Sequence, residues 1–314
     1  MTSLANPFSY ADLPNDVGRL IFELLAEDGV VSCATVSKRV RSWVERVIYR
    51  EVFLVTTEMG ALFHRTVQEI ETSSSSTKPK GFLASRVKSL FVQWGVEATL
   101  VAPILEACTG VTALALYIPD THANPQLWVV TTSDELAPTS LAIPGSALPE
   151  ANRDFLQPIF RHLTHLELLW EDEEGLDVEW ETLRSLEHLT HLSVDMQFDS
   201  EDDTVLDIVE DLLGICPESV RVFIFWVVFS AYFEPDSEHF EGIMALHRGE
   251  VDKRVVVGHS TPGPDLTEAR SGIMFMTYAD IIAGWGRPSK ARETIWSRAE
   301  DRIERRMNDR ANAT

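Results

Sequence analysis

Apolar and polar positions in the first fifty residues follow the spacing of short amphipathic helices. Pro14 suits the first turn of a helix, where its missing N–H costs nothing, and Asp16 suits the positive N-terminal end. From there, apolar side chains recur at steps of three and four residues, at Val17, Leu20, Ile21, Leu24 and Leu25. This stripe predicts the face that packs inward. Phe22 lies off it and indicates a second apolar surface.

Two further helices and a strand complete this region. Asp28-Gly29 ends the first helix, and a short second helix is expected over 30–34. A third helix places four apolar residues on one face, namely Val40, Trp43, Val44 and Val47. Residues 48–54 then alternate as in a strand. Because so small a unit buries little surface, we expect it to lean on a neighbour or a partner. The alternative is a small helical cap whose apolar stripe is entirely buried in its own core and which binds no partner.

A repeated apolar pattern occupies most of the remaining chain. Six segments of the form apolar-x-x-apolar-x-apolar begin at positions 87, 111, 138, 163, 189 and 220, so that their spacings are 24, 27, 25, 26 and 31 residues. A seventh begins at position 252, with a polar first residue. Helical stretches are expected between these strands, over 103–108, 155–162, 180–188 and 206–215. This period resembles that of leucine-rich repeats, whose strands stack in parallel along a solenoid. The alternative is a conventional α/β domain.

A last amphipathic helix is expected after Pro288. Its apolar residues are Ile295, Trp296, Ala299, Ile303 and Met307, and they can cover the open end of a repeat array. The sequence therefore predicts an α/β protein of three parts. These are a helical domain over 10–52, an irregular leucine-rich-repeat-like domain over 53–285, and a capping helix with a tail over 286–314.

Period-two alternation predicts which strand side chains point away from the repeat core. Phe91, Tyr117 and Trp226 are aromatic at such positions, and polar residues neighbour them. Aromatic anchors with polar neighbours are typical of protein-recognition surfaces. The candidate target-binding residues are Phe91, Gln93, Tyr117, His165, Glu167, His191, Asp195 and Trp226. The alternative is that flanking loops fold over this face and bury these side chains.

Charge excludes several classes of partner. The chain has 49 acidic and 27 basic residues and a formal net charge of −22, which would repel nucleic acid and anionic membranes. Seventeen acidic residues and a single Arg fall within 167–211. We favour solvated loops as the explanation. The alternative is that these loops steer a basic partner toward the repeats.

Candidate chemistry is sparse. The three cysteines Cys33, Cys108 and Cys216 are far apart, which argues against a disulfide scaffold or zinc site and favours the reducing cytoplasm or nucleus. No signal peptide is recognisable, and the longest apolar run, 222–233, is too short to span a membrane. In 258–263, Pro262 replaces the second glycine that a nucleophile elbow requires. We therefore expect no enzyme and no cofactor, and a hydrolase using His259 and Ser260 ranks last.

Two Leu-Thr-His-Leu strings place His165 and His191 in successive repeats. If the strands stack, these imidazoles lie one strand apart, close enough to share an ion or to form a pH-sensitive pair. We favour the interpretation that these histidines are simply polar residues at the edges of the strands. No metal site is predicted.

The N-terminal strings themselves resemble a known motif. Leu13-Pro14-Asn15-Asp16-Val17, Ile21-Phe22-Glu23-Leu24-Leu25, 36–43 and Ile48-Tyr49-Arg50 together resemble an F-box. That resemblance implies a three-helix unit that docks on a Skp-type adaptor, and through it on a cullin, in SCF (Skp–cullin–F-box) ubiquitin ligases. The residues that would face the adaptor are Leu13, Pro14, Val17, Ile21, Phe22, Val36, Ser37 and Trp43.

With a repeat domain attached, the resemblance implies a substrate receptor that binds a target protein and performs no chemistry itself. The alternative is a leucine-rich-repeat scaffold that recruits partners without any ligase link.

Overall fold

The computed structural model describes residues 13–72, 76, 78–118, 125–148, 153–170, 178–196, 204–227, 237, 239–260 and 273–313. The chain divides into two compact units, Met1–Val52 and Phe53–Thr314, called here the N-terminal unit and the second unit. None of the helices among the described residues has the length and apolar character needed to cross a bilayer.

The N-terminal unit consists of three short helices. Helix α1 spans Asn15–Glu27, the 3-10 helix η2 spans Val31–Thr35, and α2 spans Lys38–Ile48. Ser37 begins α2, because its hydroxyl accepts a hydrogen bond from the backbone N–H of Val40 at 3.2 Å. The buried core of the unit is small and comprises Ala26, Cys33, Val40 and Val44.

A nine-stranded sheet forms the frame of the second unit, and its first strand begins at Glu51, two residues before the division between the units. Its strands are β1 (Glu51–Leu54), β2 (Ser89–Gln93), β3 (Ala113–Tyr117), β4 (Ser140–Pro144), β5 (His165–Trp170), β6 (His191–Met196), β7 (Val222–Val227), β8 (Val255–His259) and β9 (Met274–Phe275). They lie side by side in chain order, and every pair from β2 to β9 is parallel. The predicted α/β class with parallel strands is therefore confirmed. Each of the seven repeated segments forms a strand that begins two or three residues after the segment does.

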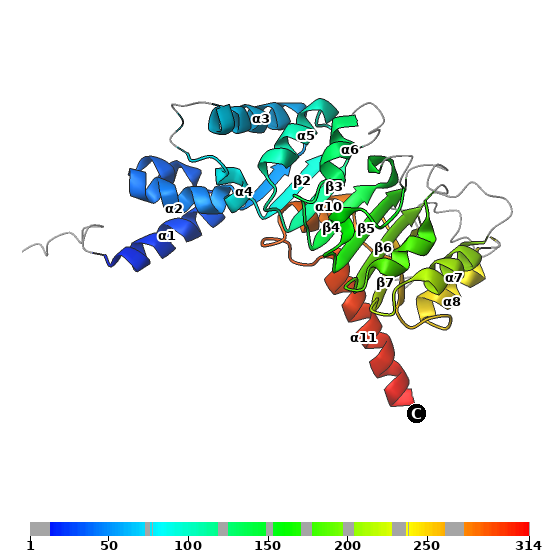
Figure 1. Cartoon of the computed structure of the whole chain (residues 1–314). Coiled ribbons are helices and arrows are strands. Elements are labelled where there is room, and N and C mark those ends of the chain that lie inside the picture. The colour runs from blue at the N-terminus through cyan, green and yellow to red at the C-terminus, as the bar shows by residue number, and fades with distance from the viewer. Residues whose placement is uncertain are drawn as a thin grey trace, which may run out of the picture. The chain divides into compact units, whose positions relative to one another are not determined.

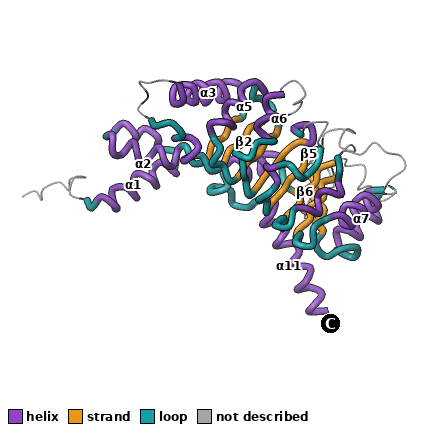
Figure 2. Tube along the Cα trace, viewed as in Figure 1, coloured by secondary structure: helices purple, strands orange, loops and turns teal. Residues whose placement is uncertain are grey.

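Helices and turns connect the strands, and Figure 1 shows α5 and α6 in front of the sheet and α3 next to α5. The helices are α3 (Thr57–Thr72), α4 (Phe82–Arg86), α5 (Ala98–Ala107), α6 (Pro125–Thr131), α7 (Val205–Ile215) and α8 (Phe240–Arg248). The connections between β4 and β6 contain the 3-10 segments η3 (Gly145–Ala147), η5 (Pro158–Phe160) and η7 (Trp180–Ser185). Figure 2 shows the strands as a central layer with the helices around them. In place of the helices predicted over 155–162 and 180–188, the structure has the short 3-10 segments η5 and η7.

A row of threonines links successive strands at their N-terminal ends. Thr112, Thr139, Thr164 and Thr190 each directly precede a strand. Each hydroxyl donates to the carbonyl of the matching residue one strand back, over 3.0–3.2 Å, and each backbone N–H donates to the same carbonyl. The same contact thus recurs four times at the sequence period.

The C-terminal segment lies on the opposite face of the sheet from α5. Strand β9 is followed by α10 (Tyr278–Gly286) and α11 (Ile295–Ala313). Figure 1 shows α10 behind the strands and α11 running beyond the edge of the sheet toward the C-terminus. Thr277 caps α10 through Asp280, and Thr294 accepts a hydrogen bond from the N–H of Ser297 at the start of α11. The prediction that α11 covers the open end of the array is wrong, because its Ile295 and Ala299 pack into the cluster on the face of the sheet.

Candidate protein-binding surfaces

The residues that the F-box resemblance assigns to adaptor contact are mostly exposed. Val17, Ile21 and Val36 expose 43%, 40% and 59% of their surface. Pro14 and Ser37 are also exposed, whereas Leu13, Phe22 and Trp43 are half-buried. Most of the predicted set is therefore available to another polypeptide.

Helix α1 is turned the opposite way from the prediction made from its apolar stripe. Phe22 faces inward, with its ring centroid 6.5 Å from that of Trp43. Gly18 and Ala26, one turn before and after Phe22, are buried and small, which leaves room for the two aromatic rings. Val17, Leu20, Ile21 and Leu24, called here the α1 stripe, face solvent instead.

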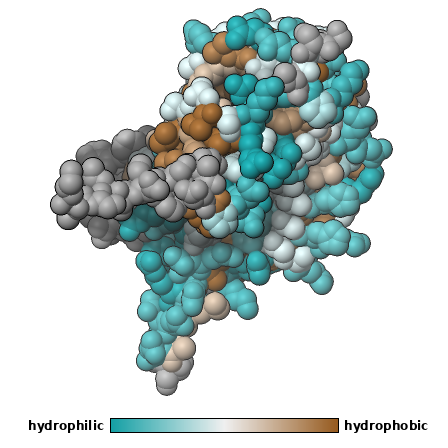
Figure 3. Space-filling view, turned by 90° about the vertical axis from the view of Figure 1, so that its left-hand side faces the viewer, coloured by the Kyte–Doolittle hydropathy of each residue, from teal (hydrophilic) through white to brown (hydrophobic). Residues whose placement is uncertain are grey.

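Besides the α1 stripe and Ile48 at the end of α2, three apolar side chains of the N-terminal unit are exposed. They are Val30 and Val31, before and at the start of η2, and Val36, just before α2. Apolar side chains reach the surface on the side of the molecule drawn in Figure 3. A contiguous exposed apolar surface marks a protein-interaction site, and the four side chains of the α1 stripe lie at helical spacing on one helix. Among these exposed side chains, Leu20, Leu24, Val30 and Val31 were absent from the predicted set.

The sheet residues predicted to bind a target are largely covered. Phe91, Tyr117, Glu167, His191 and Trp226 are all buried. Gln93, His165 and Asp195 are half-buried. The interpretation of this face as an open recognition surface is therefore wrong. The alternative, burial under flanking segments, is what the structure shows, although helices α10 and α11 form the cover rather than loops.

Aromatic and aliphatic side chains fill the space between the sheet and these helices. The ring of Phe91 lies 5.0 Å from that of Phe53 and 5.3 Å from that of Tyr117. Trp226 donates from Nε1 to the Ser193 hydroxyl at 2.8 Å. Together with residues of α10 and α11 they form a second hydrophobic core, on the face opposite the connecting helices.

One carboxyl group is enclosed in this second core. Glu167 on β5 accepts a hydrogen bond at Oε2 from the hydroxyl of Tyr117, at 3.0 Å, and another at the same oxygen from Nε1 of Trp285 on α10. Burial raises the pKa of Glu167 to about 7, because a charge is costly in an apolar site, although the two donors oppose that rise. Glu167 is thus a polar contact between the sheet and α10 whose charge changes near neutral pH.

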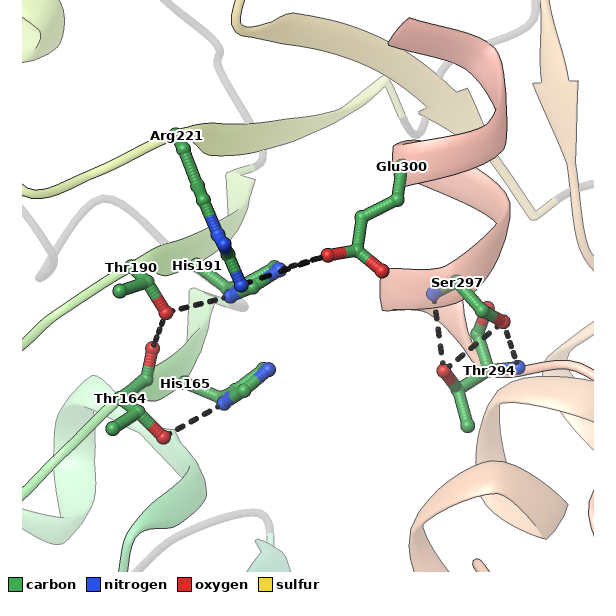
Figure 4. Close-up of polar contacts among 8 residues, drawn as sticks. All are labelled: Thr164, His165, Thr190, His191, Arg221, Thr294, Ser297 and Glu300. Atoms are coloured by element: carbon green, nitrogen blue, oxygen red, sulfur yellow. Dashed lines mark hydrogen bonds and ion pairs between the residues drawn. The ribbon is translucent and has the colours of Figure 1, made fainter. Parts of the chain in front are cut away.

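The two histidines lie side by side as predicted. His165 and His191 are direct partners in the register of β5 and β6, and their rings stack with centroids 4.1 Å apart and planes 8° apart. Figure 4 shows Glu300 of α11 reaching His191 from the side opposite Thr190. Oε1 of Glu300 lies 3.1 Å from Nε2 of His191, and the ring of Trp296 meets both imidazoles edge-on.

These histidines join α11 to the sheet rather than gather around an ion. Burial lowers the pKa of His165 to about 4, and it lowers that of His191 against the opposing effect of Glu300. Parallel rings direct their lone pairs along parallel lines, which do not converge on one ion. Within the described part of the chain, no three metal-ligating side chains form a group that could hold a metal.

Two other predicted features lie partly outside the described residues. His259 is buried against Phe275, with ring centroids 4.9 Å apart, and Ser260 follows it at the end of the described stretch. The rest of that loop, 261–263, lies outside the described residues, as do 171–177 and 197–203 of the acidic segment.

Comparison with known proteins assigns no family to this chain. No protein-family model matches it, and no curated protein matches it. Any function therefore has to be argued from its own residues and surfaces.

Proposed function

We propose that this protein is the substrate-receptor subunit of an SCF-type ubiquitin ligase. The N-terminal unit would dock on a Skp-type adaptor, and the second unit would bind the target protein. The observation that carries this proposal is the exposed α1 stripe. Four large aliphatic side chains on one helix face are left uncovered in a unit whose own core is small. Covering them with a partner would supply the burial that the unit lacks.

The order of the strands supports a repeat architecture for the receptor part. In doubly wound sheets the strand order reverses at a switch point, whereas here it follows the chain from β1 to β9. The threonine contacts recur at each step between β2 and β6. Both features fit an irregular leucine-rich-repeat-like solenoid, in which each repeat contacts its neighbours. Because α10 and α11 fill one sheet face, the target would contact the connecting segments and strand ends instead.

The proposed mechanism is proximity. A receptor that holds an adaptor with one unit and a target with the other raises the effective concentration of target lysines near the ubiquitin-carrying enzyme. Such a role needs two binding surfaces and no nucleophile.

Replacing Val17 and Ile21 with glutamate tests the docking surface. Both side chains are exposed, and glutamate is a good helix former, so the unit is expected to fold normally. Two charges placed in an apolar interface should weaken adaptor binding by at least about a hundredfold. Isothermal titration of full-length protein with a purified Skp-type adaptor measures this change, and circular dichroism checks the fold.

A matched control places the same charges elsewhere. Leu62 on α3 and Val129 on α6 are exposed aliphatic residues of the second unit. Their replacement with glutamate should leave adaptor binding unchanged. Undiminished binding by the Val17 and Ile21 variant would remove the α1 stripe as the docking surface. A folded wild-type protein with no affinity for the adaptor would instead favour a scaffold without a ligase link.

A further inference from the structure

Charge is divided unevenly between the two units. Residues 1–52 contain six basic and seven acidic residues, a net charge of −1, so the second unit carries −21 of the chain's −22. Within the N-terminal unit, positive charge is concentrated near α2. Segment 36–50 has five basic residues and a single acidic one, Glu45. An otherwise strongly acidic protein therefore has a local basic surface on its N-terminal unit.

The basic residues are at the surface and close to exposed apolar positions. Lys38, Arg39 and Arg41 are exposed in the first turn of α2 and directly follow Val36. Val40, between them, is fully buried, so the basic side chains lie off the inward face of the helix. The ion pairs described within the N-terminal unit join Arg19 to Glu23 and Arg50 to Glu27, and neither involves Lys38 or Arg41.

One hydrogen bond ties this basic turn to the start of α1. Nη1 of Arg39 donates to Oδ1 of Asn15 at 2.7 Å. Asn15 is the first residue of α1, two positions before Val17. The basic turn and the N-terminal end of the α1 stripe therefore lie next to each other, and together with Val36 they form one composite surface.

We propose that the partner docking on the N-terminal unit has an acidic rim beside an apolar groove. The groove would receive the α1 stripe and Val36, and carboxylates of the partner would face Lys38, Arg39 and Arg41. This inference rests on the proposed function and specifies the adaptor surface that it requires. Apolar burial would provide most of the affinity, and charge complementarity would provide orientation and rate of association.

The charge of the second unit makes this arrangement selective. Screening limits surface fields to about 10 Å at ordinary ionic strength, so an approaching partner senses each patch locally. The net charge of −21 on the second unit repels an acidic partner, and the basic turn of the N-terminal unit attracts it.

Charge reversal with Lys38→Glu and Arg41→Glu tests this inference on the full chain. Binding of a purified Skp-type adaptor is followed by biolayer interferometry at about 50 mM and about 500 mM NaCl. The reversal should slow association about tenfold or more at low salt and much less at high salt. The dissociation rate should change by less than about threefold. Wild-type association should itself slow as salt rises.

A second pair of variants controls for net charge and for folding. Arg65→Glu with Arg161→Glu makes the same change in total charge at exposed positions of the second unit, and should leave association unchanged. Glutamate at position 38 suits the N-terminal end of a helix, so the fold should persist. The neutral pair Lys38→Gln with Arg41→Gln should give an intermediate association rate.

The outcomes separate the two proposals. Adaptor binding that ignores both salt and charge reversal would overturn the acidic-rim inference and leave the proposed function intact. Equal slowing by the control pair would overturn it as well, because the effect would then follow total charge. A wild-type protein that fails to bind the adaptor at either salt concentration would overturn both.

Discussion

Replacing Trp285 with alanine is expected to lower the free energy of unfolding of the second unit by roughly 4 kcal/mol. Trp285 on α10 is only 7% exposed and contacts Trp296 of α11 edge to face, with ring centroids 6.5 Å apart. The substitution removes a large buried ring. It also removes the indole N–H that donates to the enclosed Glu167 carboxyl, so that Oε2 of Glu167 keeps only its hydrogen bond from Tyr117.

Trp94 provides the matched control. Its side chain is 51% exposed and stacks on Tyr278 with ring centroids 5.1 Å apart. Trp94→Ala should cost less than about 1 kcal/mol, since surface substitutions seldom cost more. Urea denaturation followed by far-UV circular dichroism measures both variants. If Trp285→Ala lowered the free energy of unfolding no more than Trp94→Ala does, then α10 would be only loosely packed on the sheet and not part of a second core.

The strands were predictable from the sequence because their signal is local. Each repeated segment buries its own aliphatic residues, and a near-constant spacing fixes neighbouring strands in matching register. The stacking of His165 on His191 follows from the same spacing, since both occupy the same place in consecutive Leu-Thr-His-Leu strings. Parallel pairing needed only this periodicity and the helical connections between segments.

The burial of one face of the sheet under α10 and α11 could not be predicted in the same way. Alternation identifies the side chains that point away from the connecting helices, but it carries no information about what lies opposite them. Glu167 meets Trp285 across 118 residues of sequence. The aromatic residues Phe91, Tyr117 and Trp226 did mark this face as unusual. A second core and a recognition surface, however, require the same residue types.

The inward-facing side of α1 could not be predicted correctly, for a related reason. Its aliphatic stripe is longer than its inward face, so hydrophobic periodicity favours burial of the stripe. The decisive contact is between Phe22 and Trp43, on two different helices. The small residues Gly18 and Ala26 on the same face as Phe22 are the one local signal that could have indicated it.

The second large expected effect is a dependence of the free energy of unfolding on pH, caused by the buried carboxyl group of Glu167. The pKa of Glu167 is about 7 in the folded protein, above its ordinary value of 4.5. Because the folded protein holds the Glu167 proton more tightly than the unfolded chain does, this group adds to the free energy of unfolding. The contribution is complete below pH 4.5 and is lost as pH rises to about 7. The difference corresponds to about 3 kcal/mol, at roughly 1.4 kcal/mol per pKa unit. Above pH 7 the loss is complete and constant.

Glu167→Gln should remove this dependence. The amide oxygen can still accept from Tyr117 and Trp285, but the side chain cannot ionise. Buried histidines also titrate between pH 4 and 6.5, with the opposite sign, since burial lowers the pKa of His165 to about 4. They are present in both proteins and cancel in the comparison.

The quantity to measure is therefore the unfolding free energy of the variant minus that of the wild type, from urea titrations between pH 4.5 and 8. It should increase steadily with pH by about 3 kcal/mol and level off above pH 7. Glu241→Gln, at a surface position on α8, is the control for the loss of one carboxyl group. A constant difference for the Glu167 variant would mean that this carboxyl is ionised and solvated throughout, and that α10 does not seal the face of the sheet.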